Sequence, residues 1–478
     1  MYKRILLVYP PSVSMNREDR CQIPVKNVVM EPLYPPMDLL SLAAVGEGEG
    51  GVCRVSDHSR GNGTPELFLR EIIEFAPDLL LMSVTTPTLA ADLGLCSAIK
   101  KVAPGVKVIA KGAHFLKFDR EVLKAYPDLD MVIRGETERT FRDIVSGADM
   151  KDIAGISWRS QQGIVSNPDR PFIEDLDGLP FPARHLVDKN RYLMPHNGRP
   201  MGVIRVSRGC PYHCFFCLAT PVAGKRVRKR SPESIVDEIK LCMDRYGMSD
   251  FVFYSDVFNV DRDWVVKLCR NITDSGLRVS WSSNVRVDSV DRETIMLMKK
   301  AGCFLVSFGV ESGSQEVRDR MGKAIRTDQI RDAMKIFKEA GLRTYPYYLI
   351  GLPWDTHETV ENTVRFAIDL GSDYAGIFTA TPFPGTRFYD YAVENGLLEN
   401  SGAESGACFE GAYRYPVAGG HYLSRDEIAL LHKKAINRYF MRPGYIAKHI
   451  GRIRSLREFL NYSKVALSLL GRGGAKRL

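Results

Sequence analysis

Residues 208–217 read Arg208-Gly209-Cys210-Pro211-Tyr212-His213-Cys214-Phe215-Phe216-Cys217 and follow a short apolar run at 203–206. Three of the ten cysteines stand here within eight residues, and the other seven are isolated. Thiolates at this spacing in one loop can bind three irons of a 4Fe–4S cluster and leave the fourth iron open to a small molecule. A tetrahedral zinc site completed by His213 is the alternative, although zinc ligands usually come as two separated pairs.

The cysteine loop opens a series of six strand–helix units. Apolar runs alternate with amphipathic helical patterns, which predicts parallel strands joined by helices. The strands are expected at 203–206, 251–254, 279–282, 305–310, 344–350 and 374–379. The helices are expected at 232–246, 263–275, 291–301, 327–340 and 356–370. Six units predict a (β/α)6 partial TIM barrel with its chemistry at the carboxyl ends of the strands, because an eight-unit barrel needs two more repeats.

The first 150 residues show a similar alternation. Strands are expected at 5–9, 54–56, 79–84, 106–110 and 131–133, with helices such as 65–75 and 89–102 between them. This pattern predicts an α/β fold with a doubly wound, Rossmann-like parallel sheet, which binds ligands beyond the carboxyl ends of its strands. Small polar residues and glycines follow these strands: Asp57, Ser83, Thr85, Thr86, Gly112 and Gly135. They suit contact with a large polar ligand, but ordinary turns and helix caps use the same residues.

The charge of the chain is concentrated at its end. The 478 residues include 66 basic and 57 acidic side chains, a net charge of +9. Ten basic residues and one acid fall in 438–478, so the first 437 residues sum to zero. Nucleic acid is therefore not an expected partner of the whole protein. A basic amphipathic helix can lie on an anionic membrane surface, and a helix docked on the barrel is the alternative.

Other features of the composition concern location and order. Apolar residues at 45% and charged residues at 26% exclude intrinsic disorder. The sequence contains no run of 18 apolar residues and opens with a short apolar run unlike a signal peptide. We expect a cytoplasmic protein with reduced thiols, or one that is peripheral at the inner membrane face through its basic tail.

The cysteine spacing, placed after the first strand of a partial barrel, resembles the signature of the radical S-adenosylmethionine superfamily. The resemblance implies that Cys210, Cys214 and Cys217 hold a 4Fe–4S cluster whose open iron chelates S-adenosylmethionine. It also implies that S-adenosylmethionine contacts Phe216, Asp256, Asn284, Arg286, Glu311 and Ser312. Asp256 stands in Tyr254-Ser255-Asp256, where many members of the superfamily have Gly-Gly-Glu.

With its N-terminal half included, the chain is similar to the cobalamin-binding radical S-adenosylmethionine enzymes. The resemblance implies a cobalamin domain at 1–150, a linker with a hairpin at 151–200, the partial barrel at 201–396, and a loop with basic C-terminal helices at 397–478. It places a corrinoid against Asp57, Ser83, Thr85, Thr86, Gly112 and Gly135. Cobalamin domains that ligate cobalt through histidine carry Asp-x-His-x-x-Gly. Here His58 follows Asp57 directly, so we predict no histidine ligand on cobalt.

The resemblance implies radical chemistry at an unactivated carbon, with C-methylation of a hydrophobic or lipid-like small molecule as the leading hypothesis. Corrinoid-assisted cyclisation or carbon–carbon coupling without methyl transfer is the alternative, and a non-enzymatic cobalamin or redox sensor is a further one. Flavodoxin or ferredoxin is an expected electron donor. The substrate pocket is expected at the barrel mouth, the 400–420 loop and the C-terminal helices, with Tyr413, Tyr415 and Tyr422 as candidates.

Overall fold

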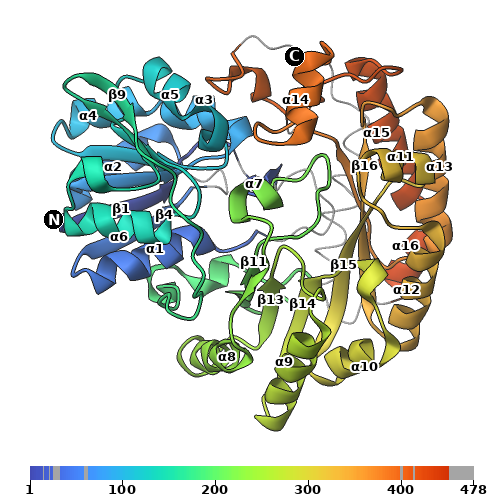
Figure 1. Cartoon of the computed structure of the whole chain (residues 1–478). Helices are drawn as coiled ribbons and strands as arrows, with labels where there is room; N and C mark the ends of the chain where they lie inside the picture. The colour runs from blue at the N-terminus through green and yellow to red at the C-terminus, as the bar shows by residue number, and fades with distance from the viewer. Residues whose placement is uncertain are drawn as a thin grey trace.

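The computed structural model describes residues 1–13, 15–20, 22–24, 33–58, 63–398, 402–412 and 415–451. Two sheets organise this part of the chain, an N-terminal sheet and a curved sheet that carries the cysteine loop (Figure 1). Tyr413 and most of the basic tail, at 452–478, lie outside the described residues.

The N-terminal sheet has seven strands in the order β4-β1-β5-β6-β7-β8-β9. Its strands are β4 (Val52–Asp57), β1 (Arg4–Tyr9), β5 (Leu79–Ser83), β6 (Lys107–Lys111), β7 (Met131–Ile133), β8 (Ile156–Ser160) and β9 (Gly163–Ser166). The first five are parallel. The chain reverses its direction of growth between β1 and β5, and the carboxyl ends of strands at such a switch point form a ligand crevice.

Helices cover both faces of this sheet, so the doubly wound prediction is confirmed (Figure 1). Buried side chains of α1 (Met37–Gly48) and α6 (Glu138–Ser146) form one core. Those of α2 (Pro65–Phe75), α4 (Cys96–Val102) and α5 (Phe115–Ala125) form the other. The hairpin expected in the linker forms as β8 and β9, and it pairs antiparallel with β7. The sheet therefore extends past the boundary at residue 150 that the sequence suggests, because β7 offers an edge to the hairpin.

The second sheet has six parallel strands in the order β10-β13-β14-β15-β16-β17. They are β10 (Met201–Arg205), β13 (Asp250–Tyr254), β14 (Ser280–Asn284), β15 (Cys303–Glu311), β16 (Arg343–Ile350) and β17 (Gly376–Thr379). Because β10 and β17 are not paired with each other, the barrel is open, as predicted. The outer layer consists of α8 (Pro232–Tyr246), α9 (Arg262–Asp274), α10 (Arg292–Lys300), α12 (Thr327–Glu339) and α13 (His357–Leu370).

The local sequence explains where these outer helices begin. Ser231 caps α8 by accepting a hydrogen bond from the amide of Ser234, and Pro232 occupies the first helical position. Asp261 and Asp291 cap α9 and α10 in the same way. Side-chain caps satisfy amides that would otherwise lack an intrahelical partner. Each barrel helix therefore starts at a fixed point after its strand, which leaves the intervening loops at the carboxyl edge of the sheet.

Two helices follow the barrel. α15 (Arg425–Phe440) packs on α13 and along the edge strand β17. α16 (Pro443–Ile450) docks on the start of β17, where His449 Nε2 lies 3.0 Å from the carbonyl oxygen of Asp373 and Lys448 Nζ lies 3.1 Å from its carboxylate. The described part of the basic tail thus packs on the barrel. None of the helices in the described ranges is long and apolar enough to cross a membrane.

Candidate cofactor and active site

The cysteine loop follows β10 through the two-residue strand β11 (Ser207–Arg208). Gly209 has φ +92°, and a Cβ at this position would lie 2.1 Å from the carbonyl oxygen of Arg226, so only glycine fits. Phe215 anchors the middle of the loop. Its ring packs 5.2 Å from Phe388 and 4.9 Å from Trp354, and its amide donates to the carbonyl of Met321. With Phe215 held in the core, Cys210, Cys214 and Cys217 face a common cavity.

Burial governs the protonation of these thiols. It raises the pKa of Cys217 to about 12 and also raises the pKa of Cys210. The thiols of Cys210 and Cys217 are therefore neutral in the protein alone, and metal binding would release their protons. His213 is exposed, and among the described residues no three His, Cys, Asp or Glu side chains converge on a single-ion site. The zinc site completed by His213 is not assembled, whereas ligands of a 4Fe–4S cluster bind separate irons and stay apart.

The three cysteines line a cavity of about 470 Å³ that also contacts the N-terminal domain and the barrel interior. Five of the six residues predicted to contact S-adenosylmethionine line the same cavity: Phe216, Asp256, Asn284, Arg286 and Glu311. Ser312 is the exception, because it is buried against α13 with its Oγ 3.2 Å from Oγ1 of Thr363. The structure therefore brings the predicted residues together with the thiols, except for Ser312.

Asp256 and Arg286 flank the cysteine loop. The carboxylate of Asp256 accepts a hydrogen bond of 2.7 Å from the amide of Gly209, immediately before Cys210. The guanidinium of Arg286 lies 3.5 Å from the ring centroid of Tyr212, inside the loop, and pairs with Asp288 at 2.7 Å. The hydrogen bond from Gly209 holds the loop through its backbone, and the contact with Tyr212 holds it through an aromatic ring. The carboxylate of Asp256 and the guanidinium of Arg286 also border the cavity.

Glu311 ends β15 in a strained conformation. Its φ is +67°, which is unusual for a residue other than glycine, and the strand register shifts at this point. The buried Nζ of Lys323 lies 2.8 Å from its carboxylate. Burial alone would lower the pKa of Lys323, but the Glu311 carboxylate outweighs it and the pKa is raised. Backbone strain of this kind concentrates at functional sites, where surrounding contacts maintain it.

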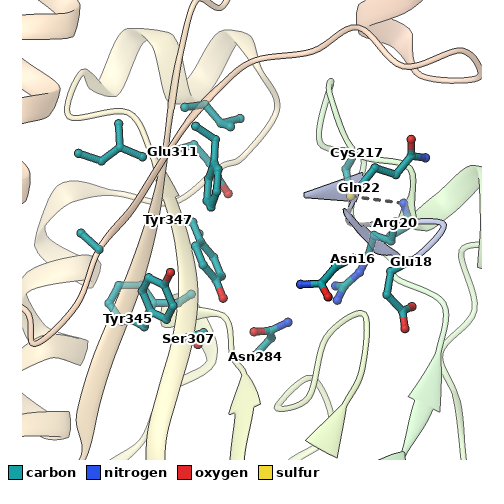
Figure 2. A pocket seen from close by; sticks show the side chains of 18 of the residues that line it. Asn16, Glu18, Arg20, Gln22, Cys217, Asn284, Ser307, Glu311, Tyr345 and Tyr347 are labelled. Carbon is teal, nitrogen blue, oxygen red and sulfur yellow. Dashed lines mark hydrogen bonds between the residues drawn. The ribbon is translucent and has the colours of Figure 1, made fainter. Parts of the chain in front are cut away.

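A hairpin that the sequence did not predict forms the facing wall. It consists of β2 (Met15–Arg17) and β3 (Gln22–Pro24) and belongs to the N-terminal domain. Its alternate polar residues point into the cavity opposite Tyr345, Tyr347 and Glu311 (Figure 2). These hairpin residues are Asn16, Glu18, Arg20 and Gln22. Residues 16–20 are all polar or charged, so the segment has no apolar alternation from which a strand could be predicted.

Two parts of the chain match known families. Residues 204–367 match the Radical SAM superfamily, and residues 25–145 match the B12 binding domain. Over 451 residues the chain is 31% identical to an uncharacterized methyltransferase of Pyrococcus horikoshii, and the match covers 94% of each protein. The chain belongs to the cobalamin-binding radical S-adenosylmethionine enzymes. Its cofactors are therefore the 4Fe–4S cluster, S-adenosylmethionine and cobalamin.

Two further comparisons bear on this enzyme family. The chain is 27% identical over 362 residues to the anaerobic magnesium-protoporphyrin IX monomethyl ester cyclase of Rubrivivax gelatinosus, covering 73% of this chain and 65% of the cyclase. The fold is similar to that of TsrM from Kitasatospora setae, a radical S-adenosylmethionine methyltransferase with cobalamin and a [4Fe-4S] cluster bound. That similarity has a TM-score of 0.69 at 16% identity and covers 99% of this chain and 100% of TsrM.

The six residues predicted to line the corrinoid groove do not share one environment in the structure. The carboxylate of Asp57 accepts a hydrogen bond of 2.6 Å from Tyr192 in the linker, and Ser83 donates to Asp38 at 2.6 Å. Thr85 pairs with Thr88 in a capping box. These three residues therefore have partners within the protein, which agrees with ordinary structural roles.

The remaining three predicted residues differ from one another. A Cβ on Gly112 would lie 2.4 Å from the carbonyl oxygen of Val84, so close packing of the chain requires this glycine. Gly135 has φ +71° and open space around it. Thr86 donates its amide to Gln22 of the hairpin, and its buried Oγ1 has no hydrogen-bond partner among the described residues.

Corrinoids carry several peripheral amide groups, which need both donors and acceptors. Asn16 and Gln22 line the cavity with amide groups of both types, although Asn16 Oδ1 and both polar groups of Gln22 also contact the protein, and the unpartnered hydroxyl of Thr86 lies on the residue whose amide donates to Gln22. The residues present therefore fit a corrinoid bound between the hairpin and the barrel mouth. His58 is placed elsewhere, with its Nε2 3.4 Å from the Glu71 carboxylate and its ring against Phe68.

Proposed function

We propose that this enzyme methylates an unactivated carbon of a hydrophobic or lipid-like small molecule. The observation that carries the proposal is a single cavity shared by the three thiols, the N-terminal hairpin and the inner wall of the barrel. When bound, the cluster with S-adenosylmethionine supplies a carbon-centred radical, and cobalamin supplies a methyl group. A shared cavity supports methyl transfer because both groups must reach the same substrate carbon without release of an intermediate to water.

The chain's own residues would have distinct tasks. Cys210, Cys214 and Cys217 would hold the cluster, with Asp256 positioned to accept a hydrogen bond from the ammonium group of S-adenosylmethionine. Asn284, Arg286 and Glu311 line the cavity near the thiols and would bind its other polar groups. Phe216, on the same loop, would lie against the adenine. These assignments follow the resemblance of the motifs to those of the radical S-adenosylmethionine superfamily.

The experiment is an anaerobic assay of the reconstituted full-length enzyme with S-adenosylmethionine deuterated in its methyl group. Extracts of a strain deleted for this protein supply the candidate substrates. We expect a product heavier by one labelled methyl group, together with 5′-deoxyadenosine. Formation of 5′-deoxyadenosine without a methylated product would contradict methyl transfer.

Cyclisation or coupling is the second candidate, and the similarity to the magnesium-protoporphyrin monomethyl ester cyclase favours it. The same assay separates the two reactions. A cyclised or coupled product would lack the label, and its mass would equal that of its precursor, or of the two coupled precursors together, less the hydrogens lost.

The proposal also includes two partners. A reduced flavodoxin or ferredoxin would supply the electron, and the exposure of Pro211 and His213 on the cysteine loop offers a route from the surface to the thiols. The C-terminal region would contact an anionic membrane surface, which suits a lipid-like substrate. Ile446 and Ile450 of α16 are 39% and 62% exposed and precede the basic segment, which supports this contact.

A further inference from the structure

The interior of the partial barrel is lined unevenly. TIM-barrel interiors are normally filled by layers of bulky side chains. Here the inward positions of β14 and β15 carry small residues, including Ser282, Ser307 and Gly309, and these line the cavity. Aromatic residues of β16, Tyr345 and Tyr347, face them from the neighbouring side (Figure 2). Small residues opposite large ones leave an open space along the barrel rather than a packed core.

This space runs the length of the strands. At the carboxyl end of β15 the cavity is lined by Glu311, and at the start of the same strand it is lined by Phe304. At about 3.3 Å per residue, this stretch of strand corresponds to roughly 20 Å. The imidazole of His196, from the segment before β10, lies 4.5 Å from the ring of Phe304, and both residues line the cavity at this lower end.

Charge divides the cavity into two parts. The lysine, arginine and carboxylate side chains that line it lie on the N-terminal hairpin or at and beyond the carboxyl ends of the barrel strands: Glu18, Arg20, Asp256, Arg286, Glu311 and Lys323. Below Asn284 and Ser307, the described lining has no such side chain, and its remaining ionisable groups are imidazoles and phenols. A carboxylate or phosphate in this lower part would meet no lysine or arginine among the described lining residues, and burial of a poorly paired charge is costly.

The helix after the barrel completes the apolar wall. Ile436 and Phe440 of α15 line the lower part of the cavity, beside the edge strand β17. His432 fixes the helix to this edge, with its Nε2 2.9 Å from the carbonyl oxygen of Ile377. The open side of the barrel is therefore covered by hydrophobic side chains where β17 would otherwise present its edge.

We propose that the lower part of this cavity is a channel for an extended, uncharged hydrophobic chain, and that Phe304 and His196 set its depth. The substrate would carry its reacting carbon near the thiols and extend its chain down the barrel. This inference rests on the proposed function and adds to it the shape, the charge and the length limit of the substrate. Ser307 lies midway and controls access to the lower part.

The test uses the full-length enzyme reconstituted with cluster and cobalamin, and phenylnaphthylamine as an uncharged fluorescent probe. Hexanol, decanol and hexadecanol compete for the probe. We expect affinity to rise by about fourfold per methylene until the channel is filled, and then to level off. Decanedioate should bind at least about tenfold more weakly than decanoate, because its second carboxylate would lie in the lower part, where the described lining has no lysine or arginine.

Two variants locate the binding. Ser307→Phe should reduce probe affinity by about tenfold or more, since its ring would fill the channel, whereas Ser307→Ala should leave the affinity unchanged. Both should retain cobalamin, cluster absorbance and binding of labelled S-adenosylmethionine. If Ser307→Phe does not fold, Phe304→Ala provides the second test. Removal of the Phe304 ring should deepen the channel, so the alcohol that binds most tightly should be longer than in wild type.

The inference is overturned if the alcohols bind without regard to length, if decanedioate binds as well as decanoate, or if Phe304→Ala leaves the length preference unchanged. Normal probe affinity in a folded Ser307→Phe variant would also overturn it. Binding is measured without turnover, so a failure of methyl transfer with chain binding intact would reject the proposed reaction and leave the channel. Methyl transfer without length-dependent binding of the alcohols would reject the channel and leave the proposed reaction.

Discussion

Arg20 and Asp256 form an ion pair between the two domains, with Nε of Arg20 3.4 Å from Oδ1 of Asp256. Arg20 belongs to the N-terminal hairpin, and Asp256 follows β13 of the barrel. The same guanidinium lies 4.9 Å from the ring centroid of Tyr254, whose ring also contacts Arg205 at 4.8 Å. Since Asp256 also accepts the amide hydrogen of Gly209, one carboxylate links the hairpin to the cysteine loop.

Asp256→Ala is expected to weaken this link more than Asp256→Asn. The alanine variant leaves the Gly209 amide without its acceptor and removes the charge beside Arg20, at a cost of about 1–3 kcal/mol. The asparagine variant keeps an acceptor for the amide. Iron content and S-adenosylmethionine affinity, measured by equilibrium dialysis, should fall in the order wild type, Asp256→Asn, Asp256→Ala. The exposed Asp263→Ala on α9 is the control, and equal losses in both Asp256 variants would contradict the prediction.

A second interdomain pair predicts an acid-sensitive docking of the two domains. Arg208, just before the cysteine loop, pairs with Glu138 at the start of α6, with Nη1 3.1 Å from Oε2. Burial alone would raise the pKa of Glu138, but the charge and hydrogen bonds of Arg208 outweigh it and hold the pKa at about 2. The folded-state pKa is thus depressed. The stabilisation is present above the unfolded pKa of about 4.3 and is lost as the pH falls toward about 2.

The expected size of this contribution is roughly 3 kcal/mol at neutral pH, as an upper limit. Glu138→Gln should lower the melting temperature at neutral pH and show a smaller further decrease on acidification than wild type. The exposed Glu394→Gln is the matched control and should follow the wild-type profile. Parallel melting profiles for wild type and Glu138→Gln below about pH 4 would exclude Glu138 as the source.

The sequence predicts the barrel well because most of its strands are apolar and its helices are amphipathic, so both periods are visible. The prediction of α8 over 232–246 agrees with the structure at both ends, since Ser231 and Pro232 mark its start and Gly247 its end. The cysteine loop is visible for a different reason, since its three ligands are close in sequence. Local signals of these two kinds are sufficient to predict the barrel fold and the three candidate cluster ligands.

The facing wall of the site was missed because it depends on tertiary contacts. The hairpin at 15–24 is polar and short, and it is held by the buried ion pair between Arg17 and Asp92 and by the amide of Thr86. Neither partner is close in sequence. The family resemblance of the segment 308–313 places Ser312 at the cofactor, but the positive φ of Glu311 turns the next side chain toward Thr363. The pattern of residue types along the chain does not reveal this change in backbone direction.

Each of Cys210, Cys214 and Cys217 is predicted to be essential for the cluster. Alanine at any of them leaves two thiolates, so the visible absorbance of the reconstituted enzyme and its acid-labile sulfide should fall strongly. Formation of 5′-deoxyadenosine should drop to background. Cys269→Ala is a suitable control because this thiol is buried in the barrel core away from the cavity. A normal cluster in any of the three variants would remove that cysteine from the ligand set.

Cobalt is predicted to have no histidine ligand from the protein. His58 packs against Phe68 with a ring-centroid distance of 5.6 Å, and its Nε2 is 3.4 Å from Glu71 on α2. Electron paramagnetic resonance of the cob(II) form should show no splitting that changes when the protein is labelled with a heavy nitrogen isotope. His58→Ala should leave the spectrum unchanged. A label-dependent splitting that disappears in His58→Ala would establish ligation by this histidine.

The last prediction concerns the basic C-terminal region, whose described part is docked on the barrel. His449 and Lys448 contact Asp373, so α16 turns this face inward, whereas Ile446 and Ile450 stay exposed. Flotation with anionic liposomes should recover the full chain, and a chain ending at Phe440 should remain unbound. Neutral liposomes are the control for charge. Equal partition of the two chains would contradict membrane contact through this region.

A charge variant separates membrane binding from loss of the docked helix. Glutamine in place of Arg452, Arg454, Arg457 and Lys464 leaves α16 intact and removes four positive charges. At about 1 kcal/mol for each basic residue near the surface, binding to anionic liposomes should fall by up to roughly a thousandfold. Exposed isoleucines alone would give similar binding to neutral and anionic vesicles. Retention of strong, charge-selective binding in this variant would assign the contact to another surface of the protein.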